Sequence, residues 1–266
     1  MKDGERELKG TVMQDRAAIV VAMLEAAVTA GDRILAVSAD ALGTEHKADK
    51  SPVTLADKAA DTVITEILGA KAPGIPIVSE ENAASIAGAP PEASYFLIDP
   101  LDGTRGFIEG SDEFTVNVAL IESGVPTLGV ILVPRWRELY WVSADGQAMM
   151  QRGAKPVAIS ARVAPADGLV ALVSRNSRNA ETEAFLAGHK ISRELPASSS
   201  LKFCQVACGL ADVYPRFAPT CEWDTAAGDA ILRAAGGSVR TPDGAALAYG
   251  KPGWLNGVFV ARGRLE

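Results

Sequence analysis

The most constraining feature of the sequence is a short, strongly apolar run that passes directly into a group of acids. Residues 95–98 read YFLI, and residues 99–104 continue as DPLDGT. Such a run predicts a buried strand, and the proline after it fixes one backbone angle and cannot continue the strand. The turn can therefore present Asp99, Asp102 and the carbonyl of Leu101 to one side. We expect the strand to end at a crevice that contains an acidic site.

A second acidic pair follows another short apolar strand. Residues 75–78 read IPIV and run into Glu80 and Glu81. Because strand ends in such sheets direct side chains into a common crevice, the two acidic groups are predicted to converge. Several carboxylates with no histidine or thiol are the ligands that Mg²⁺ prefers, and a bound cation would remove their mutual repulsion. Gly103 and Thr104 are then expected to open a helix, whose free N–H groups suit an anion.

Each acid also has a purely structural interpretation. Acids after a strand often cap turns, which is the alternative for Glu80. Asp224 lies at a predicted helix start, where capping is the common role. Asp57 lies three residues after Thr54, so the two can form a capping box with Asp in place of Glu. Both interpretations stay open for each residue alone, and the combination favours a site.

The periodicity predicts an α+β part followed by an α/β part, with a boundary at residues 161–168 and domains over 1–165 and 166–266. The first part is predicted to hold helices over 12–37 and 58–69, a polar loop over 43–51, and strands over 75–78, 95–98, 114–122, 125–133 and 138–142. The second is predicted to hold strands over 169–173, 212–217 and 257–261 and helices over 181–188, 201–209 and 225–235.

Charge and composition exclude several classes of protein. The 26 basic and 33 acidic residues give a net charge of −7, which argues against a polymeric nucleic acid as partner. An anionic substrate stays compatible, since bound cations reverse the local field. No apolar stretch reaches the roughly 18 residues of an integral membrane segment, and residues 1–10 are no secretory signal. Three cysteines and two histidines argue against a zinc site and fit a reducing compartment, so we expect a cytoplasmic protein.

Four segments make the chain resemble the inositol monophosphatase family of metal-dependent phosphatases. They are PVTLAD at 52–57, SEE at 79–81, DPLDGT at 99–104 and WDTAAG at 223–228. All four occur in the order of the family, and the resemblance spans about residue 12 to the C-terminus. It implies the family's layered αβαβα sandwich, which agrees with the two-part pattern of elements.

The resemblance also implies metal and catalytic residues by position. Two or more Mg²⁺ ions would be held by Glu80, Asp99, the carbonyl of Leu101, Asp102 and Asp224. Asp57 and Thr104 would orient and deprotonate the attacking water, and Glu80 is counted with them as catalytic. The implied reaction is in-line attack by a metal-activated water, in which positioning and charge neutralisation carry phosphoryl transfer.

Within the family, the chain is most similar to the bacterial 3′(2′),5′-bisphosphate nucleotidases of the CysQ type. The matching segments are DKSPVT at 49–54, FTVN at 114–117, SSLKFC at 199–204 and YPRF at 214–217. This implies hydrolysis of adenosine 3′,5′-bisphosphate to AMP and phosphate in sulfate assimilation. The implied substrate contacts are Gly103, Thr104, Ser199, Ser200, Lys202, Arg216 and Asp224. A second phosphate needs N–H or cationic partners away from the metals, and Ser199, Ser200 and Lys202 lie at a predicted helix start.

The cations have structural alternatives, and the chain departs from the nucleotidase pattern in places. Lys202 can be an exposed helix lysine and Arg216 a charge at a strand edge. Arg105 is followed by Gly where the group has Lys and an acid. Ser198 replaces a Gly, and Ser177 replaces a His that often contacts the nucleotide. These departures concern base contacts and substrate preference, and none touches the metal set.

Other functions are weighed against this one. The nucleophilic Asp of a haloacid-dehalogenase phosphatase is absent, since Pro100 stands two residues before Asp102. An inositol-1-phosphate or sugar-phosphate phosphatase of the same family stays open. A non-catalytic, metal-dependent binding protein is the alternative from another class, and the water-activating pair Asp57 and Thr104 argues against it. A homodimer and peripheral association with the inner face of the cell membrane also stay open.

Overall fold

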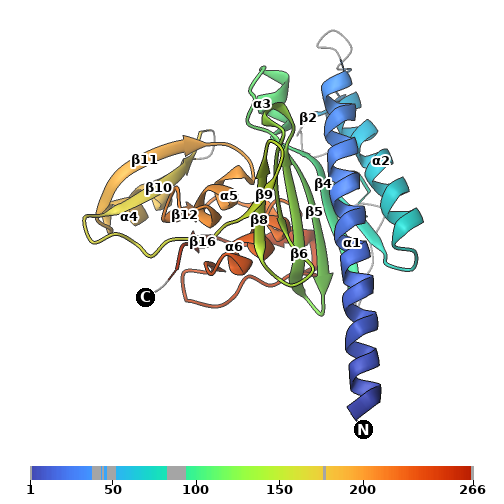
Figure 1. Ribbon diagram of the computed structural model, residues 1–266. Helices are drawn as coiled ribbons and strands as arrows, with labels where there is room; N and C mark the ends of the chain where they lie inside the picture. Colours follow the sequence, from blue (N-terminus) through green and yellow to red (C-terminus); the bar gives the residue numbers. More distant parts are fainter. Residues whose placement is uncertain are drawn as a thin grey trace.

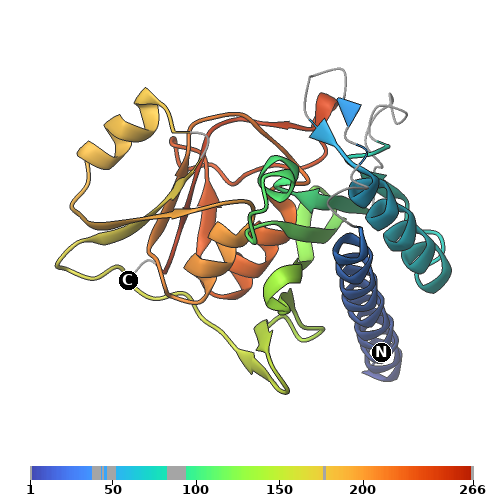
Figure 2. The ribbon, with the colours of Figure 1, turned by 90° about the horizontal axis from the view of Figure 1, so that it is seen from above.

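The computed structural model describes residues 2–37, 43, 45–46, 52–82, 94–175 and 178–264. In this part of the chain, helices and two large sheets stack as five layers (Figure 1, Figure 2). Two helices cover the outer face of the first sheet, two more lie between the sheets, and one helix packs on the far face of the second sheet. The layered αβαβα sandwich expected from the sequence is confirmed. Of the helices described, none combines the length and the apolar character that crossing a membrane requires.

The first sheet has seven strands in the order β3-β4-β5-β6-β7-β8-β9. These are β3 (Ile77–Ser79), β4 (Ser94–Asp102), β5 (Thr115–Glu122), β6 (Val125–Val133), β7 (Glu138–Val142), β8 (Ala148–Arg152) and β9 (Pro156–Ala158). From β4 onward each strand pairs antiparallel with the next, whereas β3 pairs parallel with β4. The five strands predicted here are confirmed. The edge strands β8 and β9 were not predicted, because they are short and poor in the β-branched residues that mark a strand.

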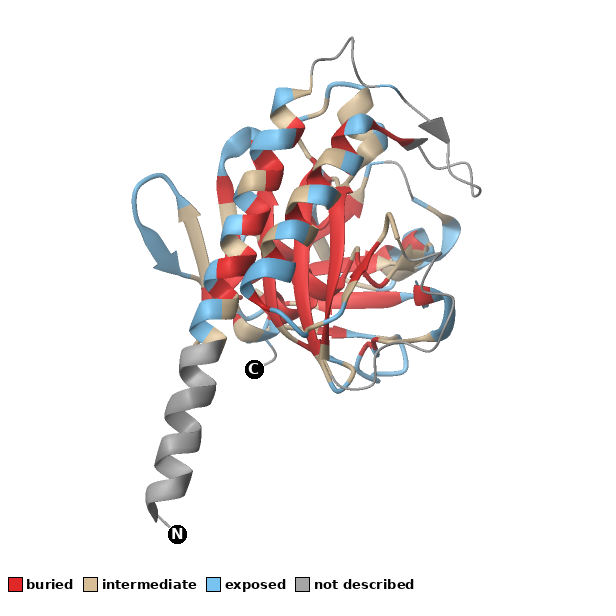
Figure 3. Ribbon diagram, turned by 90° about the vertical axis from the view of Figure 1, so that its right-hand side faces the viewer, coloured by how far each residue is buried: buried red, intermediate tan, exposed pale blue. Residues whose placement is uncertain are grey.

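Helices α1 (Lys2–Ala36) and α2 (Leu55–Lys71) pack side by side on the outer face of this sheet. Figure 3 shows their buried residues toward the sheet and their exposed ones toward solvent. Buried positions on α1 recur at helical spacing: Val20, Met23, Ala27, Ala30 and Ile34. The two-residue strands β1 (Glu45–His46) and β2 (Pro52–Val53) pair with each other. The prediction of a loop was therefore wrong at residues 45–46.

The second half of the chain supplies the inner helices and the second sheet. Helices α5 (Leu201–Ala207) and α6 (Ala226–Ala234) lie between the sheets, and α4 (Ala180–Ala187) lies outside. The sheet order is β11-β10-β12-β16-β14, with β10 (Leu169–Ser174), β11 (Ile191–Ala197), β12 (Val213–Arg216), β14 (Ser238–Arg240) and β16 (Phe259–Arg262). The shorter elements are α3 (Thr104–Ile108), η3 (Pro134–Trp136), β13 (Thr220–Cys221), η4 (Pro252–Trp254) and β15 (Leu255–Asn256). The edge strand β11 was missed because its sequence, ISRELPA, is mostly exposed and contains proline.

The closest approach of the first sheet to α6 occurs at a glycine of β6. A Cβ atom at Gly129 would lie 2.4 Å from the backbone oxygen of Ala227. The Cβ atom would be fixed to the backbone of β6, and the oxygen belongs to the backbone of α6. Neither atom can therefore move without displacing the strand or the helix. The lack of a side chain at this position lets α6 lie against the sheet, and α6 follows directly on Asp224.

We predict that Gly129→Ala lowers the free energy of unfolding by about 1–3 kcal/mol, through overpacking against α6. Urea denaturation followed by circular dichroism measures it. The matched control is Gly69→Ala in α2, where an added Cβ meets no atom within 4 Å. That change is expected to raise stability by about 0.5–1 kcal/mol. Equal effects of the two substitutions would contradict the close approach at Gly129.

Candidate active site

An irregularity in β4 brings two acids to the same face of the first sheet. Asp99 lies opposite Asn117 on β5, and Asp102 lies opposite Thr115. Three residues of β4 therefore advance against two residues of β5, which is a β-bulge. Side chains alternate along a regular strand, so residues three apart would face opposite sides. The extra residue in the bulge turns Asp99 and Asp102 to one face, as the DPLDGT turn predicted.

The third acid comes from the neighbouring strand. Because β3 and β4 run parallel, they end at the same edge, and the backbone N–H of Glu80 donates to Ile98 O at 3.1 Å. Burial raises the pKa of Asp99 well above its ordinary value, and the charges of Glu80, Asp102 and Asp224 raise it further. Burial and the charge of Asp102 likewise raise the pKa of Asp224. Glu80 of the second acidic pair therefore lies within electrostatic reach of Asp99.

Asp57 caps α2 with one carboxylate oxygen and contacts Thr104 with the other. Its Oδ2 accepts from the backbone N–H of Thr54 at 2.8 Å and from the Thr54 hydroxyl at 2.6 Å, which completes the capping box of α2. Its Oδ1 accepts from the Thr104 hydroxyl at 3.0 Å. The same hydroxyl lies 3.0 Å from Leu101 O. The cap thus fixes one carboxylate oxygen of Asp57 and leaves the other beside Thr104, next to the acidic cluster.

The chemistry of this cluster fits a divalent cation. Within the described ranges, no three acidic, histidine or cysteine side chains are already gathered around one point as a bound metal ion requires. The carboxylates nevertheless lie near enough to raise the pKa of Asp99, which is almost fully buried. Buried like charges are unfavourable without an opposite charge. An all-oxygen set with an uncompensated negative charge is suited to Mg²⁺ and not to a soft metal.

The acidic cluster is joined to the second half of the chain at the start of α5. The backbone N–H of Ser200 donates to Asp102 Oδ2 at 2.6 Å, and the Ser200 hydroxyl donates to Asn117 Oδ1 at 2.6 Å. Thr115 Oγ1 lies 2.8 Å from the same hydroxyl. The polar residues on the bulged face of β4 and β5 therefore converge on Ser200. Their signal in the sequence was the alternation of polar and apolar residues in FTVN.

Gly103 and Ser199 both have a positive backbone φ angle and lie in direct contact. Gly103 has φ 97° and Ser199 has φ 56°, a region that favours glycine. The Ser199 hydroxyl donates to Asp102 O at 3.0 Å and lies 3.2 Å from Glu113 O. A Cβ atom on Gly103 would lie 2.4 Å from that hydroxyl oxygen. Gly103 is thus required by the close approach of the two halves of the chain.

Lys202 is buried at the base of the cavity, so the interpretation as an exposed helix lysine is wrong. Its side chain is 3% exposed, and Nζ donates to Ser199 O at 2.7 Å and to Ala197 O at 3.3 Å. Nζ also lies 5.0 Å from the ring centre of Tyr214. Burial lowers the pKa of Lys202 to about 8, and the charge of Asp102 opposes that shift. Two of the three ammonium hydrogens have carbonyl partners, which leaves one for a ligand.

Asp102 and Asp224 share a cavity of about 170 Å³ with the two cations, whereas Glu80 and Asp99 are not among the residues that line it. Its lining includes Asp102, Gly103, Ser199, Ser200, Lys202, Arg216 and Asp224, together with the departing residues Arg105 and Ser198. The guanidinium of Arg216 is held by the carbonyls of Ala218 and Pro219. Ser177 and the 49–51 part of the DKSPVT segment lie outside the described residues.

One ion pair at the rim of the cavity was not found from the sequence. Glu113 accepts two hydrogen bonds from Arg175, at 2.9 and 3.0 Å, and one from the backbone N–H of Ser198 at 2.9 Å. These contacts hold the pKa of Glu113 below its ordinary value against the effect of burial. Glu113 precedes β5 and Arg175 follows β10, so the pair connects the two sheets. No local pattern marks either residue, because the contact is purely tertiary.

Comparison with known proteins agrees with this site. Residues 15–262 match the model of the inositol monophosphatase family. The chain belongs to the inositol monophosphatase family. It is 43% identical over 222 residues to the 3′(2′),5′-bisphosphate nucleotidase CysQ of Salmonella typhimurium, covering 83% of this chain and 89% of that protein. It is 40% identical over 223 residues to the protein of the same name from Buchnera aphidicola, covering 83% of each.

A solved structure of the same family has the same fold. The crystal structure of CysQ from Bacteroides thetaiotaomicron superposes with a TM-score of 0.78 at 36% identity. The match covers 92% of this chain and 97% of that one. The inositol monophosphatase from Anabaena gives a TM-score of 0.71 at 26% identity, over 91% of this chain and 89% of that one. The chain therefore has both the sequence and the architecture of this family of metal-dependent phosphatases.

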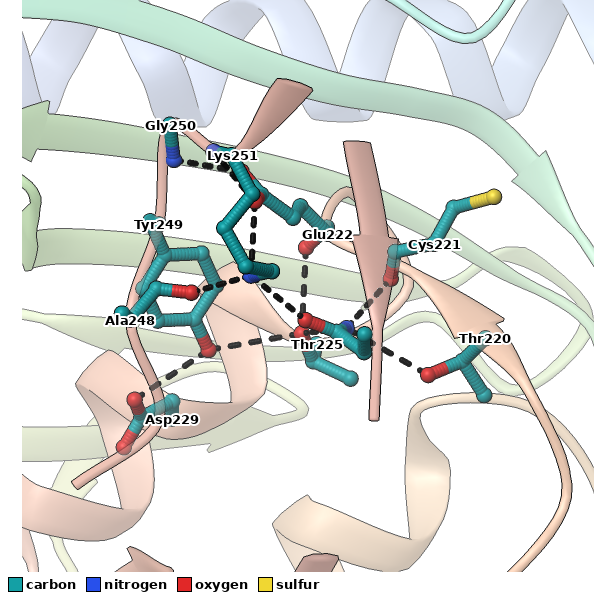
Figure 4. Close-up of polar contacts among 10 residues, drawn as sticks. Thr220, Cys221, Glu222, Thr225, Asp229, Ala248, Tyr249, Gly250 and Lys251 are labelled. Carbon is teal, nitrogen blue, oxygen red and sulfur yellow. Dashed lines mark hydrogen bonds and ion pairs between the residues drawn. The ribbon is translucent and has the colours of Figure 1, made fainter. Parts of the chain in front are cut away.

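In this inositol monophosphatase family member, a buried polar network holds the turn that carries Asp224 (Figure 4). The fully buried carboxylate of Glu222 accepts from the backbone N–H groups of Gly250 and Lys251, at 2.7 and 2.9 Å. It also pairs with Lys251 Nζ at 2.7 Å. Within the turn, Asp224 Oδ2 accepts from the backbone N–H of Cys221 at 2.8 Å. Asp224 thus closes the turn before α6, whose N-cap is Thr225.

The same network continues into α6 through a buried acid. The hydroxyl of Tyr249 donates to Asp229 Oδ2 at 3.1 Å, and Asp229 Oδ1 is buried without a hydrogen-bond partner among the described residues. Burial raises the pKa of Asp229 to about 7, although Arg233 and the Tyr249 hydroxyl lower it. Because its pKa is raised in the folded state, Asp229 contributes to the free energy of unfolding fully at pH values below the ordinary pKa of Asp. This contribution is lost as the pH rises to about 7, the pKa in the folded state.

We predict that Asp229→Asn removes part of the pH dependence of stability. Between pH 5 and pH 8 the wild-type protein should lose about 2–3 kcal/mol that the variant keeps, since its amide cannot ionise. Urea denaturation at both pH values measures the difference. Asp167→Asn, at an exposed acid, is the control and should leave the dependence unchanged. An unaltered pH profile in Asp229→Asn would mean that this carboxyl is ionised at little cost.

Proposed function

We propose that this chain is a Mg²⁺-dependent 3′(2′),5′-bisphosphate nucleotidase that hydrolyses adenosine 3′,5′-bisphosphate to AMP and phosphate. The observation that carries the proposal is that two acids of the cluster, Asp102 and Asp224, line one cavity together with Lys202 and Arg216. The substrate has two phosphates, so it needs a site for the reacting group and a separate cationic site for the other. The names of the CysQ relatives support the same substrate.

The acids are assigned to the reacting phosphate. Glu80, Asp99, Asp102, Asp224 and the carbonyl of Leu101 are the metal ligands in this proposal. Magnesium ions bound there would supply the positive charge that neutralises the carboxylates and the transferring phosphoryl group. Asp57 and Thr104 hold the attacking water, because one oxygen of Asp57 is fixed by the cap of α2 and the other directs the Thr104 hydroxyl. The cap therefore preorganises the pair that receives the proton of the water.

The second phosphate is assigned to Lys202 and Arg216. Lys202 has one ammonium hydrogen left, and burial strengthens its interaction with an anion, because water does not screen it. The side chains of Ser199 and Ser200 are engaged in the contacts between the two halves, so their part in binding is to position α5 and Lys202. Gly103 permits that contact. The departures Arg105 and Ser198 lie at the same cavity and are assigned to the nucleoside.

The direct test compares phosphate release from adenosine 3′,5′-bisphosphate and from inositol 1-phosphate, with Mg²⁺ and with EDTA. We expect release that requires Mg²⁺ and a preference of at least ten-fold for the nucleotide, about 1.4 kcal/mol of transition-state discrimination. A preference for inositol 1-phosphate would replace the substrate assignment. Release from neither substrate would contradict the proposed activity.

We predict that Asp102→Asn lowers kcat by about 100-fold or more, equivalent to about 2.7 kcal/mol. The amide oxygen still accepts from the backbone N–H of Ser200, so the fold is expected to persist, but the negative charge is lost. Steady-state assays at saturating Mg²⁺ and a thermal melt measure the two effects. Asp112→Asn, at an exposed acid of the loop between α3 and β5, is the control. Near-wild-type turnover in Asp102→Asn would remove Asp102 from the metal site.

We predict that Lys202→Met lowers kcat/KM for adenosine 3′,5′-bisphosphate about ten-fold more than for inositol 1-phosphate. Methionine keeps the apolar stem in its buried position and removes the charge together with the two hydrogen bonds to Ser199 O and Ala197 O. Lys190→Met, at an exposed lysine, is the control and should change neither value. Equal losses on the two substrates would show that Lys202 acts on the fold or on the reacting phosphate, and not on the second one.

The division into two domains, the cytoplasmic location and the homodimer stay predictions, as does the role in sulfate assimilation. The chain passes from the first sheet to the second between β9 and β10, close to the proposed boundary at residues 161–168. This supports the division.

A further inference from the structure

A groove of about 430 Å³ opens on the outer face of the second sheet, remote from the layer that holds the acidic cluster. Helix α4 packs across β12 on this face, and one short helix cannot cover five strands, since strands are about 4.8 Å apart. The groove lies beside α4 over β16 and β14. Its main walls are Phe185, His189, Phe217, Arg240, Val260 and Arg262. Its volume is in the range of small-molecule sites.

The strand register places two arginines on the same face of the sheet. Arg240 of β14 lies opposite Val260 of β16, and Ser238 lies opposite Arg262. Directly opposed residues and residues two apart on a strand share a face. Arg240 and Arg262 therefore flank Val260, which forms an apolar floor between them. The two guanidinium groups reach the groove from neighbouring strands.

Arg262 is half-buried without an acidic partner. Its guanidinium lies 5.4 Å from the ring centre of Phe185, and Nη2 lies 3.3 Å from His189 Nε2. Neither neighbour carries a negative charge, and burial lowers the pKa of Arg262. Other arginines of the described chain form ion pairs with carboxylates: Arg162 with Asp212, and Arg175 with Glu113. No ion pair of Arg262 or Arg240 with a described carboxylate is present, and no acidic side chain lines the groove.

His189 orients this guanidinium. Its Nδ1 lies 2.7 Å from the carbonyl oxygen of Phe185, so this nitrogen carries the hydrogen and donates it. The other nitrogen, Nε2, then has a lone pair that accepts from Arg262. The imidazole also stacks on the ring of Phe185, with centroids 4.1 Å apart. These contacts fix one edge of the Arg262 guanidinium and leave its remaining N–H groups for a ligand.

We propose that this groove is a second ligand site that binds a small phosphorylated compound with a planar ring, such as a mononucleotide. Arg262 and Arg240 hold the phosphate, because the planar guanidinium donates to two phosphate oxygens at once. The half-exposed ring of Phe217, tilted against Phe185 at 5.7 Å, provides a surface for the planar ring of the ligand. The half-buried Arg262 and the exposed Arg240, whose guanidinium also donates to Gly244 O at 2.8 Å, recognise an anion, and the aromatic wall selects one with a flat apolar part.

The groove is separate from the catalytic cavity, although one strand connects them. Arg216 at the end of β12 lines the catalytic cavity, and Phe217, the next residue, lines the groove. Consecutive residues of an extended chain point to opposite faces. The two sites therefore lie on opposite faces of the second sheet, and substitutions in the groove leave the catalytic side chains in place.

The test is isothermal titration calorimetry of the full-length protein in EDTA with AMP, inorganic phosphate and adenosine. We expect saturable binding of AMP, weaker binding of phosphate and still weaker binding of adenosine. Arg262→Gln should weaken AMP binding about ten-fold or more, about 1.4 kcal/mol, while phosphate release in the enzymatic assay with Mg²⁺ stays at the wild-type level. The matched control is Arg193→Gln, an exposed arginine on β11 of the same sheet, which should bind AMP as the wild type does.

Three results would each overturn the proposal. The first is an AMP affinity that is equal in Arg262→Gln and in the wild type. The second is AMP binding that is lost in Lys202→Met but kept in Arg262→Gln, which would place the ligand in the catalytic cavity. The third is the absence of saturable AMP binding, or adenosine binding as tight as that of AMP, which would remove the phosphate from recognition.

Discussion

The hydrogen bond from the backbone N–H of Ser200 to the carboxylate of Asp102 holds the two halves of the active site together. It joins residues 98 positions apart in the chain, and the Ser200 hydroxyl extends the contact to Asn117. Because Ser200 directly precedes α5, this contact fixes the helix that carries Lys202. Without it, the acids of the first sheet and the cations of the second half would not face the same cavity.

Electrostatic repulsion between the carboxylates of the site opposes the stabilisation that this hydrogen bond provides. Burial and the charges of neighbouring acids raise the pKa values of Asp99 and Asp224, so the folded chain holds more negative charge in one place than a purely structural cluster would tolerate. The surrounding structure compensates with rigid supports. The cap of α2 fixes Asp57, the bulge in β4 orients Asp99 and Asp102, and the network around Glu222 holds the turn of Asp224.

The second sheet separates two regions of different character. Its inner face meets α5 and α6 and carries Arg216 to the catalytic cavity, whereas on its outer face α4 packs against β12. On that outer face Arg262 is half-buried beside Phe185 and His189, where an ordinary surface arginine would extend into solvent. The alternation of side chains on β12 explains why adjacent residues, Arg216 and Phe217, belong to different sites.

The sequence by itself predicted the order of most helices and strands and indicated which acidic residues belong to the candidate site. Strong helical periodicity predicted α1 and α2, and apolar runs predicted β4 to β7, because these signals arise from residues near in the chain. Edge strands such as β11 escaped, since an exposed strand has no distinctive pattern. The segments at 52–57, 79–81, 99–104 and 223–228 identified the family and named the acids in advance.

Only the tertiary structure decided how those residues are used. The capping and the catalytic interpretation of Asp57 were alternatives in the sequence; the structure shows the cap, and it leaves the second carboxylate oxygen beside Thr104, so the two interpretations are compatible. From the sequence, Lys202 could be an exposed lysine on a helix. It is buried, because its helix, α5, is packed between the two sheets. The pairs of Glu113 with Arg175 and of Glu222 with Lys251 join distant segments. Local patterns cannot encode such contacts, since the partners become neighbours only when the layers pack.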